Sequence, residues 1–317
     1  DGAVARARAY KAFAADFLDS IQGLPTLAAF GQTANRARHL GERSADLYRA
    51  TMWVLSVSVA TTQFPSTVPH LGNAGGTNGQ LDALDDRLYA AHIRNGRLWT
   101  AHNFRVSTGG VASTATGNRN GTRWYELQNL NTTPTVVQSG TVFDSTATNP
   151  KHYWIPSIMV SGQGHAAMGF SAAGNTTAAS AAYTGRLAGD SAGAMQAPTI
   201  YAAGAGNYNP AADPGGASGR RWGDYSYTSL DPNDDMTFWT IQEFNDSFNS
   251  YGVRIVKLSP PPPAAPSSAS ASVQAGGPAV NVVVTGVSSS GSGFFDPGAG
   301  FANRIAASVS GTGVTVN

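Results

Sequence analysis

Residues 94–99 read RNGRLW and join two β-prone runs, residues 88–93 and 97–104, through the pair Asn95-Gly96. Both residues of this pair tolerate the positive φ angles that a two-residue hairpin turn requires. The flanking runs carry aliphatic and aromatic side chains, which are typical of strands. The stretch therefore predicts a β-hairpin, and it guides the interpretation of the residues around it.

Similar short β-prone runs continue to about residue 258, and Gly, Asn, Ser and Thr separate them. Further turns are predicted at residues 161–162 and 232–234, whose residue types favour turns. The order of turn, strand and closing aromatic recurs at residues 234–239, which read DDMTFW. Many short strands at close spacing are typical of a propeller, sandwich or barrel, and the weak repetition favours a propeller.

The composition is also that of a turn-rich β protein. Charged residues make up 12% of the 317 residues, against about 25% in an average soluble protein. The formal net charge is +1, so there is no electrostatic case for a nucleic-acid partner. The chain has no cysteine, which excludes disulfides, thiolate zinc sites and cysteine nucleophiles.

The first fifty-odd residues differ from the rest in composition and in the spacing of their apolar residues. They are predicted to form two helices, at residues 3–22 and 33–57. Tyr10, Phe13 and Phe17 recur at helical spacing, and the first helix is expected to end at Gly23. No run of about 18 apolar residues occurs, so we expect no complete membrane span.

Residues 17–31, FLDSIQGLPTLAAFG, and residues 50–55, ATMWVL, resemble the membrane domain of bacterial ABC exporters of the thiol-reductant (cytochrome bd assembly) type. The resemblance covers residues 1–57 and implies an inner-membrane origin for that segment. The nucleotide-binding pattern GxxxxGK[ST] does not occur in the sequence, so ATP-driven transport does not carry over to this chain.

Five later stretches resemble large secreted bacterial β-propeller or surface proteins: residues 68–73 (VPHLGN), 84–88 (LDDRL), 95–102 (NGRLWTAH), 221–226 (RWGDYS) and 231–244 (DPNDDMTFWTIQEF). The resemblance covers residues 64–258 and implies propeller blades. Residues 229–231 and 237–239 resemble a loosened Asp-box, the hairpin signature of sialidase-like propellers. The Asp-box implies a fold and does not imply sialidase activity.

Residues 259–272 are rich in Pro and Ser and are predicted to be an extended polyproline II linker. Residues 291–301, GSGFFDPGAGF, resemble the start of an immunoglobulin-like IPT/TIG repeat, which would occupy residues 273–317. The predicted fold class is therefore mainly β. It comprises a partial β-propeller with sialidase-like blades at 64–258, preceded by an α-helical segment and followed by a fragment of an Ig-like β-sandwich.

Four residues are candidates for ligand binding: Trp99, Arg221, Trp222 and Asp224. A tryptophan could stack on a sugar ring, although packing in the core is the alternative for each tryptophan. Asp224, together with Asp85-Asp86 and the neighbouring arginines, could form a carboxylate pair or a cation site. Salt-bridged turns are the alternative interpretation of these charges.

Asp231, Asp234 and Asp235 form a second candidate site, because clustered carboxylate oxygens suit calcium. The spacing is not that of an EF-hand, since Met236 and Gln242 occupy the positions of the required Gly and Glu. In the structural alternative, Asp231 caps turn amides, while Asp234 and Asp235 face solvent. No other cofactor is expected.

Residues 189–193, GDSAG, match the GxSxG pattern of a serine nucleophile elbow. That motif needs a helix after the serine, whereas Pro198 and a β-prone run follow here, so we expect a surface turn at Ser191. The sequence favours a non-enzymatic extracellular or cell-surface module that binds a glycan or a protein. The alternatives are an exporter membrane-subunit fragment fused to an unrelated β domain, and a hydrolase on a propeller scaffold.

Overall fold

The computed structural model describes residues 64–270, 274, 276–287, 292–306 and 308. All of them lie in the compact unit Ala50–Asn317. The two predicted helices, and with them the exporter-like segment 1–57, lie outside the described residues.

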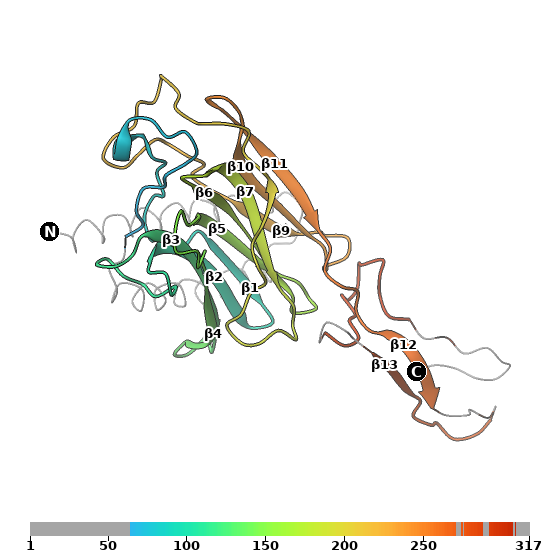
Figure 1. Cartoon of the computed structure of the whole chain (residues 1–317). Coiled ribbons are helices and arrows are strands. Elements are labelled where there is room, and N and C mark those ends of the chain that lie inside the picture. The colour runs from blue at the N-terminus through green and yellow to red at the C-terminus, as the bar shows by residue number, and fades with distance from the viewer. Residues whose placement is uncertain (1–63, 271–273, 275, 288–291, 307, 309–317) are drawn as a thin grey trace, which may run out of the picture. The chain divides into compact units, whose positions relative to one another are not determined.

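The described part is mainly β and its sheets are antiparallel, as the sequence predicted (Figure 1). Sheet I has the order β1-β2-β3-β4: β1 (Ala90–Arg94), β2 (Arg97–Val106), β3 (Arg119–Gln128) and β4 (Thr135–Val142). Sheet II has the order β5-β6-β7-β8: β5 (His152–Val160), β6 (Ala166–Gly174), β7 (Thr177–Arg186) and β8 (Thr199–Ala202). Sheet III has the order β11-β10-β9: β9 (Tyr227–Leu230), β10 (Phe238–Ser247) and β11 (Ser250–Leu258).

A short helix and a two-stranded sheet complete the described part. A short 3-10 helix, η1, spans Gly76–Gly79. Strands β12 (Ala265–Ser270) and β13 (Val283–Val287) pair with each other. β12 falls inside the predicted linker, where Pro266 is followed by a register shift before the ladder resumes at Ser268. A proline lacks the amide hydrogen that a regular ladder needs, and such an irregularity accommodates it.

The Asn-Gly hairpin forms as predicted. Arg94 pairs with Arg97 across the turn, and Asn95 and Gly96 have φ angles of 50° and 70°. Two consecutive positive φ angles define the tight turn whose twist matches that of the flanking strands. The turn therefore fixes the register of β1 on β2.

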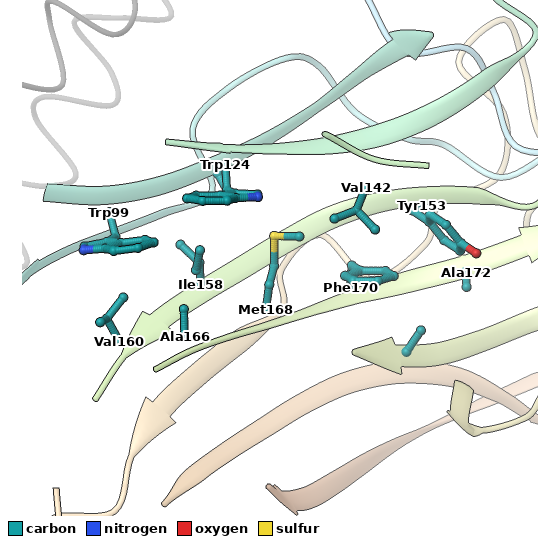
Figure 2. Packing of buried hydrophobic residues seen from close by; sticks show 12 residues of the cluster. Trp99, Trp124, Val142, Tyr153, Ile158, Val160, Ala166, Met168, Phe170 and Ala172 are labelled. Carbon is teal, nitrogen blue, oxygen red and sulfur yellow. The ribbon is translucent and has the colours of Figure 1, made fainter. Parts of the chain in front are cut away.

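Sheet II lies between the other two sheets, because β5 contacts β1, β2 and β3, whereas β6 and β7 contact β10. The interface between sheets I and II is apolar. Trp99 and Trp124 from sheet I stack with ring centroids 5.5 Å apart, and they belong to one buried cluster with Ile158, Met168 and Phe170 of sheet II. Figure 2 shows the two indole rings facing these side chains. Burial of this cluster is the main apolar contribution that holds the two sheets together.

The interface between sheets II and III is polar. The backbone N–H of Thr228 donates to the hydroxyl of Ser157 at 2.9 Å, and the hydroxyl of Thr228 donates back to the Ser157 carbonyl at 3.0 Å. Gln242 Nε2 donates to Thr240 Oγ1 at 2.6 Å. These groups are buried and satisfy one another, which removes most of the cost of burying polar atoms.

Gly169 in β6 allows this close approach. A Cβ atom at this position would lie 2.1 Å from Gln242 Nε2 and 2.2 Å from Thr240 Oγ1. Both of those side chains are almost fully buried, so they have little room to move. The absence of a side chain at Gly169 therefore sets the spacing of sheets II and III.

A second buried cluster joins residues 68–84 to residues 205–223. Trp222 packs edge-on against Tyr208, with ring centroids 5.1 Å apart, beside Trp154 and Leu81. The buried guanidinium of Arg220 donates to the carbonyl oxygens of Gly79, Asp213 and Ala74. Hydrogen bonds from the Arg220 side chain thus hold these two loop segments together, where few strand pairings do so.

We predict that Gly169→Ala destabilises the protein by about 1–3 kcal/mol, the usual cost of overpacking a close-packed interface. The thermal midpoint should then fall by roughly 2–4 °C for each kcal/mol of stability that is lost. The matched control is Gly216→Ala, because no heavy atom lies within 4 Å of a Cβ atom built there. The control should leave the midpoint unchanged or raise it slightly. Equal midpoints for the two variants would show that the sheets are not in contact at Gly169.

Candidate functional site

The four predicted ligand-binding residues do not form one exposed site. Trp99 is 5% exposed and Trp222 is 2% exposed, and they belong to different buried clusters. The indole N–H of Trp222 donates to Ser171 Oγ at 3.3 Å. Both tryptophans therefore occupy the core, the alternative that the sequence left open, and neither presents a ring face to a ligand.

Arg221 and Asp224 are exposed, and they form an ion pair with each other. Arg87 pairs with Asp85 in the same manner, with 2.6 Å between Nε and Oδ1. The backbone amide of Arg87 also donates to that carboxylate, at 3.1 Å. These charges therefore form salt-bridged turns. Exposed pairs of this kind contribute about 0–1 kcal/mol each to stability.

The three aspartates of the candidate calcium site point to different partners. Asp231 accepts hydrogen bonds from the amide of Asn233 at 3.0 Å and from Trp239 Nε1 at 3.0 Å. Asp234 Oδ1 accepts from the amides of Met236 and Thr237, both at 2.8 Å. These bonds hold the pKa of both carboxyls below the usual value; for Asp231 the bond from Trp239 is the largest cause, whereas for Asp234 they outweigh a desolvation that acts in the opposite direction. Asp231 therefore caps a turn amide, as the structural alternative predicted. Asp234 was predicted to face solvent, but it is half-buried and caps two further amides of the same turn.

Asp235 was predicted to face solvent, and this prediction is wrong, because the residue is only 6% exposed. Arg94, the last residue of β1, donates from Nη1 to Asp235 Oδ1 at 2.7 Å and from Nη2 to the other oxygen. The Asp235 carbonyl accepts the amide of Gly162 at 3.1 Å. Within the described part of the chain, no group of three or more His, Cys, Asp or Glu side chains is placed to hold a metal ion.

Ser191 lies in an exposed turn, as predicted. Its carbonyl accepts hydrogen bonds from the amide of Ala194 at 3.1 Å and from Arg186 Nη1 at 2.8 Å. The chain then continues through irregular residues into β8, and the serine is not followed by the helix that a nucleophile elbow requires.

Sheet III presents an exposed apolar face, which we call the outer face: Tyr227, Trp239, Ile241, Glu243, Val253, Ile255 and Lys257. The register places Tyr227, Ile241 and Ile255 side by side across the three strands. Their neighbours on β10 point the other way, since Phe238, Thr240 and Gln242 are buried towards sheet II. Tyr227 is 64% exposed, Val253 62% and Ile255 59%. Exposed apolar side chains gathered on one sheet face make the outer face a candidate interaction site.

The sequence did not reveal the outer face as a site. Alternation along residues 250–258, SYGVRIVKL, shows that Tyr251, Val253 and Ile255 share one side of a strand. The pattern alone predicts that this apolar side is the buried one. Only the packing of sheet III on sheet II through Thr240 and Gln242 shows that it is not.

Glu243 is the titratable group on the outer face with a perturbed pKa. Its pKa is raised to about 7: burial is the largest cause, the hydrogen bond with the Gly223 backbone opposes the shift, and the negative charge of Asp224 adds to it. The carboxyl therefore exchanges its proton near neutral pH. A single such group beside an open sheet face can donate a hydrogen bond to a ligand when it is protonated and accept one when it is ionised.

A cavity of about 680 Å³ opens at a different place. Its walls are lined by residues 65–67, 69, 77, 80, 82–84, 117–118 and 217–218, together with Arg105 and His152. Its volume is in the range of small-molecule sites, and its lining is mostly polar.

Comparison with protein-family models, with curated proteins and with solved structures finds no match for this chain. In the described part of the chain, no helix is both long and apolar enough to cross a membrane.

We predict that Asp235→Asn lowers the free energy of unfolding by about 1–3 kcal/mol, because it leaves the guanidinium of Arg94 partly buried without its counter-charge. Asparagine tolerates the φ of 55° at this position, so backbone strain does not contribute. The matched control is Asp85→Asn, which removes an exposed pair and should cost less than about 1 kcal/mol. Urea unfolding measures both, with calcium and with chelator, and calcium should change neither curve. A large calcium-dependent stabilisation would establish a metal site instead.

We predict that Glu243→Gln raises the thermal midpoint at pH 8 and leaves it unchanged at pH 4. The folded pKa lies above that of the unfolded chain, so the unfolded state loses its proton first. The native protein then loses stability as the pH rises from about 4.5 to about 7. The expected gain at pH 8 is on the order of 1 kcal/mol after allowance for solvent screening. Equal effects of the substitution at both pH values would contradict this assignment.

Proposed function

We propose that residues 64–258 form part of a β-propeller and act as a non-enzymatic binding module of an extracellular or cell-surface protein. The face-to-face stacking of antiparallel sheets, each following the last along the chain, supports the propeller architecture. The low charge and the abundance of Gly agree with a secreted-type β protein. In this proposal, residues 273–317 begin an IPT/TIG-like domain.

The outer face of sheet III carries the proposal. Exposed aromatic rings gather there, with Tyr227 and Trp239 on neighbouring strands at diagonal positions of the register, and with Tyr225 and Tyr251 exposed close by in the sequence. The flat face of an aromatic ring packs against the C–H groups of a sugar ring, and the edges of Tyr and Trp carry hydrogen-bonding groups. Glu243 and Lys257 add polar partners on the same face. We therefore propose a glycan as the ligand of the outer face.

A protein ligand is the second candidate. Val253 and Ile255 are β-branched and more than half exposed, and they adjoin the aromatic residues on β11. Apolar aliphatic surface of this kind packs well against another protein surface and contributes little to sugar binding. The exporter-fragment alternative rests on residues 1–57, which are outside the described part.

We expect the full chain to co-sediment with at least one insoluble bacterial or plant polysaccharide, tested as purified peptidoglycan, chitin and cellulose. Tyr227→Ala and Trp239→Ala should each weaken the association roughly 10-fold or more, in line with the loss of a ring that contacts the ligand. The matched control is Phe248→Ala, which removes from the β10–β11 turn an aromatic ring whose exposure is similar to that of Tyr227.

Retention of all three variants at the wild-type level would contradict glycan binding on the outer face. So would the absence of the wild-type chain from every pellet. In the second case, Ile255→Lys tests the protein alternative. The substitution should abolish any self-association or partner binding measured by analytical ultracentrifugation, because a charge replaces the central apolar contact.

A further inference from the structure

The cavity beside Arg105 is a second place where the described residues are arranged to receive a ligand. Arg105 is in β2, and its side-chain stem crosses Gly117, where a Cβ atom would lie 2.4 Å from Arg105 Cγ. Because Gly117 has no side chain, the Arg105 side chain has room to lie along the cavity wall. This site is separate from the outer face, and the inference stands whether or not that face binds a glycan.

The guanidinium of Arg105 has no hydrogen-bond or ion-pair partner among the described residues, and its Nε is buried without one. Two other arginines of the described part do have partners for their guanidinium groups: Arg119 donates from Nη1 to the carbonyls of Asp144 and Thr146, although its Nη2 is buried without a partner, and Arg220 donates to the carbonyls of Ala74, Gly79 and Asp213. Burying an unpaired charged donor is unfavourable. A site in which a guanidinium has no protein partner is suited to an anionic ligand group, because a carboxylate can accept two parallel hydrogen bonds from the planar guanidinium.

The other polar groups of the cavity suit hydroxyl groups. His152 Nδ1 accepts the amide of Asn120 at 3.2 Å, so the neutral ring carries its proton on Nε2 and can donate from there. Burial lowers the pKa of His152 to about 4, which keeps the ring neutral at pH 7. Asp82 uses one oxygen to accept the amide of Leu84 at 2.7 Å, and a carboxylate has further acceptor capacity.

The backbone at Leu84 gives a further indication that the cavity wall is specialised. Leu84 has a φ of 57°, a conformation that leucine seldom adopts, and the Asp82 carboxylate bonds to its amide there. Strained residues of this kind are concentrated at functional sites.

We propose that this cavity binds a small polyhydroxylated carboxylate, such as a uronic acid, with Arg105 pairing with the carboxylate and with His152 and Asp82 contacting hydroxyl groups.

The test compares D-glucuronate with D-glucose by titration calorimetry on the full chain at pH 7. The two sugars differ only in the carboxylate, so glucuronate should bind at least about 10-fold more tightly. Arg105→Gln should weaken glucuronate binding about 10-fold or more and leave the affinity for glucose unchanged. Arg254→Gln is the matched control, since Arg254 is an exposed arginine of β11 outside the cavity, and it should change neither affinity.

Folding of the variant is checked by its thermal midpoint, which should not fall, because Arg105 has no partner to lose. Arg105→Lys keeps the charge without the planar fork, so its affinity should lie between those of the wild type and Arg105→Gln. Three results would overturn the proposal: equal affinities for the two sugars, no binding of either, or unchanged glucuronate binding in folded Arg105→Gln.

Discussion

The described structure depends on one strand, β6, that is buried at every position from Ala166 to Gly174. A strand covered on both faces must place side chains in two interfaces at once. Met168 and Phe170 supply the bulk on the side of sheet I, whereas Gly169 and Ser171 leave room on the other side. Because the two sets alternate, a shift of register by one residue would move the bulky side chains into the narrow interface. The alternation of large and small residues in β6 therefore fixes the order in which the sheets stack.

The two faces of sheet II are held by different kinds of interaction, and this difference bears on specificity. The apolar interface tolerates rearrangement of similar volumes, since hydrophobic contact has no direction. The interface with sheet III instead pairs donors with acceptors, including Ser157 with Thr228. Each such bond contributes only about 1 kcal/mol net, but a mismatch would leave buried groups unsatisfied. The polar interface thus selects one arrangement of the sheets, while the apolar one provides most of the stabilisation.

Local features of the fold could be predicted from the sequence, whereas features that depend on packing could not. The Asn95-Gly96 turn followed from residue types alone, because positive φ angles limit which residues fit there. Trp99 and Trp222 are buried by elements distant in sequence, so their exposure had no local signal. Asp235 is bonded to Arg94, which is 141 residues away, and nothing in the sequence around either residue indicates the other. The unpaired guanidinium of Arg105 likewise becomes visible only when its surroundings are known.

The pair between Arg94 and Asp235 connects the end of sheet I to the β9–β10 turn of sheet III, and the Gly162 amide ties the β5–β6 turn of sheet II to the same residue. All three sheets are therefore fastened at one end by a single aspartate. Fluctuations that separate one sheet from the next must break this junction or begin at the opposite end of the strands. Amide hydrogens in the two turns will then exchange with solvent through the same opening event, which makes these turns one cooperative unit in spite of their distance along the chain.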